Sequence, residues 1–152
     1  MIYLAGPIDR ATSKLVWGEV IAGLRLAGLN QPLFVPFRAF DVLPAQARSK
    51  DVKALVDINR FALENCELML LNYQPGIESW GCPQELMFAW SALVPVVVLL
   101  PGETDINTLP IYLRAWVKEE NFVSSIEDAV MRITEILAQP KEVRYEQRHN
   151  SI

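Results

Sequence analysis

The sequence predicts one doubly wound α/β domain, with a five-stranded parallel sheet in the order 2-1-3-4-5 and helices on both faces. Short apolar runs alternate along the chain with segments of helical period, which is typical of parallel sheets. Each run is apolar at every position, as expected for strands that are covered on both faces. The 152 residues suit a single domain, and a hydrophobic content of 51% suffices for a core. We expect this domain over residues 1–138, followed by a polar tail at 139–152.

The individual elements follow from apolar patterning and from the residues placed to begin or end them. Gly28 is placed to end the first helix, and Ser49 to cap the second. Ser124 and Glu127 have the spacing of a capping box ahead of the last helix. Strands are therefore expected at residues 2–5, 33–35, 68–71, 96–100 and 122–123, and helices at 13–27, 50–65, 83–93, 110–118 and 126–137.

Composition excludes several classes of function. Fourteen Lys and Arg against eighteen Asp and Glu give a net charge of -4, which argues against polymeric nucleic acid as a partner. Two cysteines, Cys66 and Cys82, cannot build a disulfide scaffold or a four-cysteine zinc site, and they fit a reducing cytoplasm. The apolar run at 94–100 is far too short to span a membrane, and the start of the chain is unlike a signal peptide. We therefore expect a soluble cytoplasmic protein with no metal and no membrane partner.

The predicted topology also indicates where a ligand binds. In a doubly wound sheet, ligands lie beyond the carboxyl ends of the strands where the strand order reverses, here between the first and third strands. The loop at 6–12 has too few glycines for a dinucleotide or P-loop site, so no organic cofactor is expected. The long loop at 72–82 leads to Glu85 near a helix start. Because the single histidine, His149, lies in the polar tail, carboxylates are the expected catalytic groups.

Three stretches carry a resemblance to a known family. They are YLAGPI at 3–8, DINRFALENCELMLL beginning at Asp57, and SWGCPQELMFAWSALVPVVVLL at 79–100. In this order they resemble the nucleoside 2-deoxyribosyltransferases and their nucleoside 5′-monophosphate N-glycosidase relatives. The resemblance covers about Tyr3 to Leu100 and implies cleavage of the N-glycosidic bond of a (2′-deoxy)nucleoside or its 5′-monophosphate. The small-molecule partner is then a nucleoside or nucleotide.

The resemblance also implies catalytic roles for three residues. Glu85 matches the nucleophile, which would form a glycosyl ester that water or a second base then attacks. Asp57 would contact or protonate the leaving base, a role that needs a raised pKa. Tyr3 would orient Glu85 or the sugar.

Further positions are implied to bind the substrate. Gly6 and Ile8 belong to the turn that encloses the nucleoside in the family. Ser79, six residues before Glu85, stands where the transferases tend to have Asp and the monophosphate hydrolases Ser, so it favours a nucleotide. The positions that would assist are Gly81 through its backbone amide, Arg10 as a counter-charge, and Asn107, which matches an Asn contributed by a neighbouring subunit in some members. A homo-oligomer, a dimer or larger, is accordingly expected.

Other readings of the same residues remain open. Glu85 in a first helical turn can simply interact with the helix dipole, Asp57 can form a solvated ion pair, and Tyr3 can be a core residue. The sequence does not decide between transferase and hydrolase. It also allows a non-catalytic module that binds or senses a nucleotide, or a domain for subunit interaction.

Overall fold

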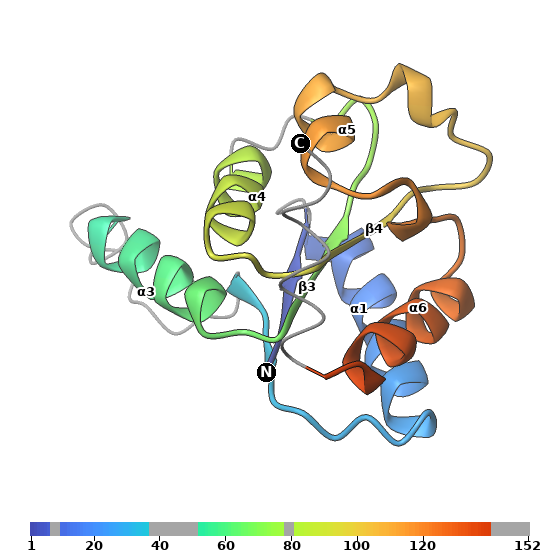
Figure 1. The fold of residues 1–152 in the computed structure, drawn as a ribbon, viewed down its shortest axis with the longest axis horizontal. Coiled ribbons are helices and arrows are strands. Elements are labelled where there is room, and N and C mark those ends of the chain that lie inside the picture. Colours follow the sequence, from blue (N-terminus) through green and yellow to red (C-terminus); the bar gives the residue numbers. More distant parts are fainter. Residues whose placement is uncertain (7–9, 37–51, 78–80, 141–152) are drawn as a thin grey trace.

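The computed structural model describes residues 1–6, 10–36, 52–77 and 81–140. Its five strands form one parallel sheet in the order β2-β1-β3-β4-β5. They are β1 (Ile2–Ala5), β2 (Leu33–Phe34), β3 (Leu68–Asn72), β4 (Val96–Leu99) and β5 (Phe122–Val123). The predicted fold class and strand order are confirmed (Figure 1).

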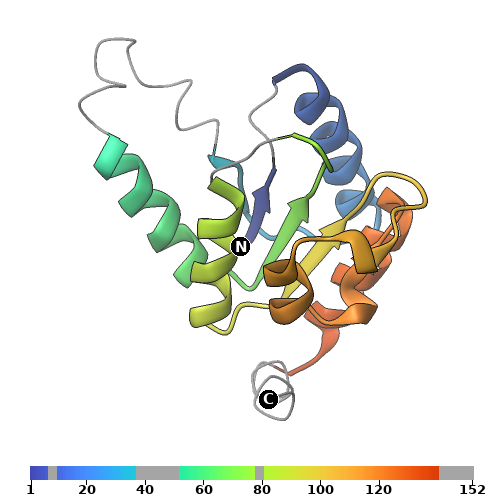
Figure 2. The ribbon, with the colours of Figure 1, turned by 90° about the horizontal axis from the view of Figure 1, so that it is seen from above.

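Helices cover both faces of the sheet (Figure 2). On one face lie α1 (Arg10–Leu26) and α6 (Ile126–Ala138), and on the other α3 (Val52–Glu64), α4 (Gly81–Ser91) and α5 (Ile111–Trp116). Two short 3₁₀ turns, η1 (Ile106–Thr108) and η2 (Glu119–Asn121), lie between β4 and β5. Among the described residues, no helix is long and apolar enough to cross a membrane.

Alternation along the strands divides the core into two layers. Ile2 and Leu4 point toward α1 and α6, whereas Tyr3 and Ala5 point toward α3, α4 and α5. All four are buried, as expected for a central parallel strand that is covered on both sides. The alternation matters for function because it directs the Tyr3 side chain beneath α4.

Helix termini test the predicted boundaries. Gly28 ends α1 as predicted: it has φ +79°, its N–H donates to the Arg25 carbonyl, and the Leu29 N–H donates to the Leu24 carbonyl. This pattern of a left-handed residue with a six-to-one hydrogen bond is a Schellman motif. The tail at 141–152 and the predicted N-cap Ser49 lie outside the described residues.

Helix α6 begins at Ile126 as predicted, but its predicted cap is wrong, and α1 begins at Arg10, before the predicted residue 13. Ser125, not Ser124, caps α6, because its hydroxyl accepts the Asp128 N–H at 3.0 Å. The two candidate N-caps are adjacent in sequence, and Ser125 is the one whose extended backbone and side-chain hydrogen bond are those of an N-cap. Helix α4 begins at Gly81, two residues before the predicted Pro83, since proline is tolerated in a first turn where its N–H needs no partner. Glu85 therefore stands at the start of the second turn.

Candidate active site

Tyr3 and Glu85 meet between β1 and α4. The Tyr3 hydroxyl donates a hydrogen bond of 2.6 Å to Glu85 Oε1, although 82 residues separate the two. Tyr3 is fully buried, and its ring stacks on Phe34 of β2 with ring centroids 5.3 Å apart. Glu85 as a whole is half-buried. The strand and the stacked ring fix the hydroxyl in place, so the carboxylate is held by a rigid donor.

Burial dominates the electrostatics of this pair. It raises the pKa of Glu85 because the charged form loses solvation, and the hydrogen bond from Tyr3 partly opposes this by favouring the carboxylate. The pKa of Tyr3 is also raised, first by burial and then by the neighbouring Glu85 charge. Tyr3 therefore remains a protonated donor at neutral pH. In the described part of the chain, its hydroxyl is the one side-chain donor to Glu85.

The strand-order reversal lies between β1 and β3, and Gly6 and Asn72 meet there. A Cβ on Gly6 would lie 3.2 Å from the Trp17 ring and 3.3 Å from both Asn72 Cβ and the Asn72 carbonyl oxygen. Gly6 thus allows a close approach of the chain to the end of β3. Asn72 is only 4% exposed, and its Nδ2 has no acceptor among the described residues. Asn72 was not among the predicted site residues, although it ends the apolar run of β3 at the carboxyl edge of the sheet, where ligands bind.

Asp57 lies on the outer side of α3. Its carboxylate accepts a hydrogen bond of 2.7 Å from Lys53 Nζ, and its side chain is 58% exposed. The structure does not bring Asp57 to Tyr3 and Glu85, so a contact with a leaving base would require this ion pair to open. The alternative of a solvated ion pair describes the observed geometry, with Lys53 as the partner.

The remaining predicted site residues are dispersed. Arg10 begins α1 and Gly81 begins α4, whereas Ile8 and Ser79 lie outside the described residues. Asn107 is exposed in η1 and binds Asp105 through its backbone N–H and its Nδ2, at 2.9 and 3.0 Å.

Asn107 also lines a cavity of about 460 Å³ at the β5 side of the sheet. Neither Tyr3 nor Glu85 lines this cavity, which is bounded by Thr104, Asp105, Ile106, Asn107, Arg114, Val117, Glu119 and Phe122. A contribution of Asn107 to a neighbouring subunit stays a prediction. Within the described ranges, no group of three or more His, Cys, Asp or Glu residues is placed to hold a metal ion.

Comparison with known proteins identifies the fold. No family model and no curated protein matches the sequence. Among solved structures, a conserved protein of Enterococcus faecalis V583 superposes with a TM-score of 0.73 at 18% identity, over 88% of this chain and 96% of that one. A 2-deoxyribosyltransferase of Bacillus psychrosaccharolyticus gives a TM-score of 0.61 at 16% identity, over 85% and 89% of the two chains. The chain has the 2-deoxyribosyltransferase fold.

A third structure extends this finding to a glycosidase. The CMP N-glycosidase BcmB of Clostridium botulinum gives a TM-score of 0.50 at 17% identity, over 88% of this chain and 97% of that one. The predicted resemblance to the nucleoside 2-deoxyribosyltransferases is thus confirmed in the fold, which also accommodates a glycosidase. At these identities the likeness is one of architecture, and the chemistry of this chain must be argued from its own side chains.

Proposed function

We propose that this chain is an enzyme that cleaves the N-glycosidic bond of a nucleoside or nucleoside 5′-monophosphate, with Glu85 as the nucleophile. The observation that carries the proposal is the 2.6 Å hydrogen bond from the buried Tyr3 hydroxyl to Glu85. It places a carboxylate with one oxygen engaged by a fixed donor on a fold shared with a deoxyribosyltransferase and an N-glycosidase. A held carboxylate suits the positive charge that develops at C1′ as the base leaves.

The reaction would proceed in two displacements. In the first, the pair of electrons in the C1′–N bond leaves with the base, which takes up a proton from solvent, while a Glu85 oxygen bonds to C1′. In the second, water or another base attacks C1′, the ester electrons return to Glu85, and the attacking group releases a proton. Tyr3 favours the ionised form of the free Glu85 carboxyl, because its hydrogen bond opposes the rise in pKa that burial causes.

The phosphate preference and the role of Asp57 remain predictions. Ser79, Gly81 and Arg10 are proposed to favour a 5′-monophosphate. Asp57 lies in an ion pair with Lys53 on the exposed side of α3, so its contact with the base is proposed from the family resemblance alone.

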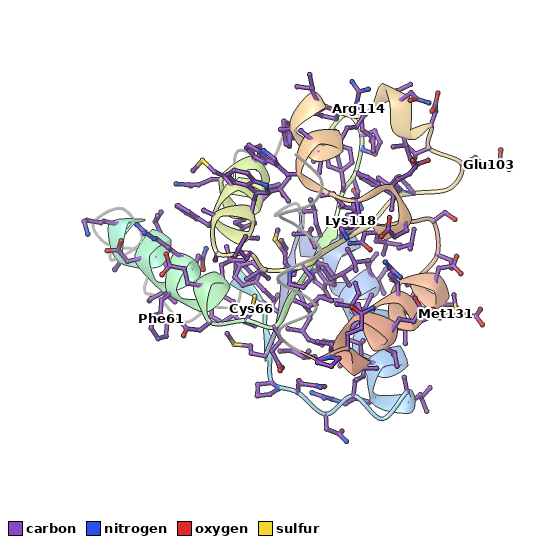
Figure 3. The ribbon with its side chains drawn as sticks, viewed as in Figure 1. Phe61, Cys66, Glu103, Arg114, Lys118 and Met131 are labelled. Atoms are coloured by element: carbon purple, nitrogen blue, oxygen red, sulfur yellow. The ribbon has the colours of Figure 1, made fainter. Side chains whose placement is uncertain are left out.

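The test is a chromatographic screen for free base with the common nucleosides and their 5′-monophosphates. We expect at least one substrate, and we expect Glu85→Gln to reduce its cleavage to background. Glu103→Gln is the matched control, because Glu103 is exposed on the loop after β4, away from α4 (Figure 3). A second free base in the mixture separates the outcomes: a hybrid nucleoside indicates transfer and its absence indicates hydrolysis. Full activity of Glu85→Gln would exclude the proposed nucleophile.

We also propose that the chain self-associates, as expected from the family resemblance. The face formed by α3, α4 and α5 exposes large apolar side chains that a second copy could cover. They are Ile58, Phe61, Met87, Trp90 and Ile111. Sedimentation should show a dimer or larger species that Phe61→Glu weakens, whereas Leu26→Glu on α1 should not. A monomer in the unmodified chain would refute this.

A further inference from the structure

The cavity of about 460 Å³ at the β5 side of the sheet is lined by neither Tyr3 nor Glu85. Its wall combines η1 and the residues just before it with α5, η2 and β5. The volume falls within the roughly 300–1,000 Å³ that is typical of small-molecule sites in proteins. The side chains of the wall therefore indicate what kind of small molecule this cavity accepts.

Arg114 of α5 supplies the positive charge of the cavity (Figure 3). Its Nε donates a hydrogen bond of 3.1 Å to the Leu109 carbonyl, which anchors the guanidinium. Among the described residues, its two terminal nitrogens have neither a hydrogen-bond acceptor nor an ion-pair partner. Because these nitrogens form a fork that matches the two oxygens of a carboxylate, Arg114 is suited to bind an anionic group.

Asp105 and Glu119 supply two negative charges to the same cavity. Oδ1 of Asp105 accepts hydrogen bonds from the backbone N–H and Nδ2 of Asn107, at 2.9 and 3.0 Å, which leaves Oδ2 without a donor in the described ranges. The Glu119 carboxylate, at the start of η2, forms no hydrogen bond or ion pair with any residue that the structure describes. Both side chains therefore have oxygens available for a cationic donor.

The three charges line one cavity without neutralising one another. Within the described part of the chain, neither carboxylate forms an ion pair with Arg114. A simple anion at Arg114 would be repelled by the two carboxylates, and a simple cation would be repelled by the guanidinium. A ligand that carries both an anionic and a cationic group satisfies both kinds of side chain at once.

The rest of the wall includes apolar side chains from three elements. Val117 is buried, and Ile106 and Phe122 are half-buried. An aliphatic group of a ligand that packs against them is removed from water, which favours binding. Free amino acids combine these properties, because each carries a carboxylate and an ammonium group on a carbon skeleton.

We propose that this cavity binds a free amino acid, whose carboxylate pairs with Arg114 and whose ammonium group pairs with Glu119 and Asp105. Two carboxylates against one guanidinium give the wall one net negative charge, so neutral and basic amino acids are favoured over acidic ones. This inference does not depend on the proposed glycosidic cleavage, because the Tyr3–Glu85 pair contributes no side chain to the cavity.

Calorimetric titration of the full chain at pH 7 tests the site. The probes are leucine, lysine and glutamate, with two analogues of leucine: 4-methylpentanoate, which lacks the ammonium group, and 3-methylbutylamine, which lacks the carboxylate. The variants are Arg114→Gln and Glu119→Gln. Arg25→Gln and Glu127→Gln are the matched controls, because each removes an exposed charge that does not line the cavity.

We expect leucine and lysine to bind more tightly than glutamate and than either analogue of leucine. Arg114→Gln and Glu119→Gln should each weaken leucine binding by about fivefold or more, since each removes a charge-assisted contact at a partly solvated site, and the controls should not. Glu119→Gln should not weaken the binding of 4-methylpentanoate, which has no ammonium group. The proposal is overturned if no amino acid binds, if leucine binds no better than 4-methylpentanoate, or if neither variant weakens leucine binding.

Melting without a ligand separates effects on binding from effects on folding. Because the Glu119 carboxylate has no partner in the described protein, Glu119→Gln should melt as the unmodified chain does. Arg114→Gln also loses the bond to the Leu109 carbonyl, so Arg114→Lys is added: it retains the charge without the fork and should bind leucine with intermediate affinity.

Two other occupants are distinguished by the same titrations. Heat released with nucleoside 5′-monophosphates but not with amino acids would assign the cavity to the proposed substrate. Heat of dilution that depends on protein concentration, without any response to amino acids, would assign it to contact between two copies. Either result overturns this inference, whereas failure to cleave any nucleotide overturns only the proposed function.

Discussion

Removing the Tyr3 hydroxyl tests the physical basis of the site without any substrate. Tyr3→Phe retains the ring that stacks on Phe34 and deletes only the donor 2.6 Å from Glu85 Oε1. A hydrogen bond to a charged group contributes about 1.5–3 kcal/mol, so we expect a loss of that order in the free energy of unfolding when Glu85 is ionised. The loss should be smaller when Glu85 is protonated, since a neutral carboxyl depends less on the donor.

The expected pH dependence follows from the raised pKa of Glu85. A carboxyl whose pKa is higher in the folded than in the unfolded state binds more protons when folded, so stability falls as pH rises above its unfolded pKa. The Tyr3 bond lowers the folded pKa, and its removal therefore raises that pKa further and deepens the fall. The difference between Tyr3→Phe and the unmodified chain should widen as pH increases through this window.

Urea unfolding between pH 4 and 8 measures this difference. Tyr73→Phe is the control, because Tyr73 is half-buried and its hydroxyl has no hydrogen bond among the described residues. A Tyr3→Phe variant as stable as the unmodified chain, or one whose deficit is constant over this pH range, would show that the hydrogen bond does not stabilise the ionised Glu85 carboxyl. In the glycosidase assay the same variant should lose about 10- to 100-fold in kcat/KM, since each 1.36 kcal/mol corresponds to a factor of ten.

Three further substitutions have expected outcomes that urea unfolding also measures. Glu85→Gln should be more stable than the unmodified chain at pH 7, and this gain should be smaller at pH 4, because the variant buries no charge at residue 85. A gain that does not change with pH would argue against the raised pKa of Glu85. Gly6→Ala should cost about 1–3 kcal/mol through crowding against Trp17, and a neutral effect would show that the contact relaxes freely. Ser125→Ala should cost about 0.5–2 kcal/mol and Ser124→Ala almost nothing, and the reverse order would restore the originally predicted cap.

Sequence and structure contribute differently to the candidate site. The pairing of Tyr3 with Glu85 could be anticipated from the family resemblance, and their hydrogen bond is observed. The orientation of Asp57 could not. Apolar residues at helical spacing indicate that α3 has an inner side. Neighbouring residues are rotated by about 100° about the helix axis, so residues next to the apolar stripe can face either the core or solvent, and the sequence does not decide which. Packing against the sheet turned Asp57 toward Lys53 and solvent, and Asn59 inward.

The sequence by itself determined the parallel sheet and its two covered faces, because continuous apolar runs are stable only when buried on both sides. It also determined the end of α1 at Gly28, where a left-handed residue requires no neighbour from elsewhere in the chain. Only the tertiary structure decided which polar atoms are buried. The Glu85 carboxyl near Tyr3 and the amides of Asn59 and Asn72 acquire their environments from elements distant in sequence, and no local pattern records that burial.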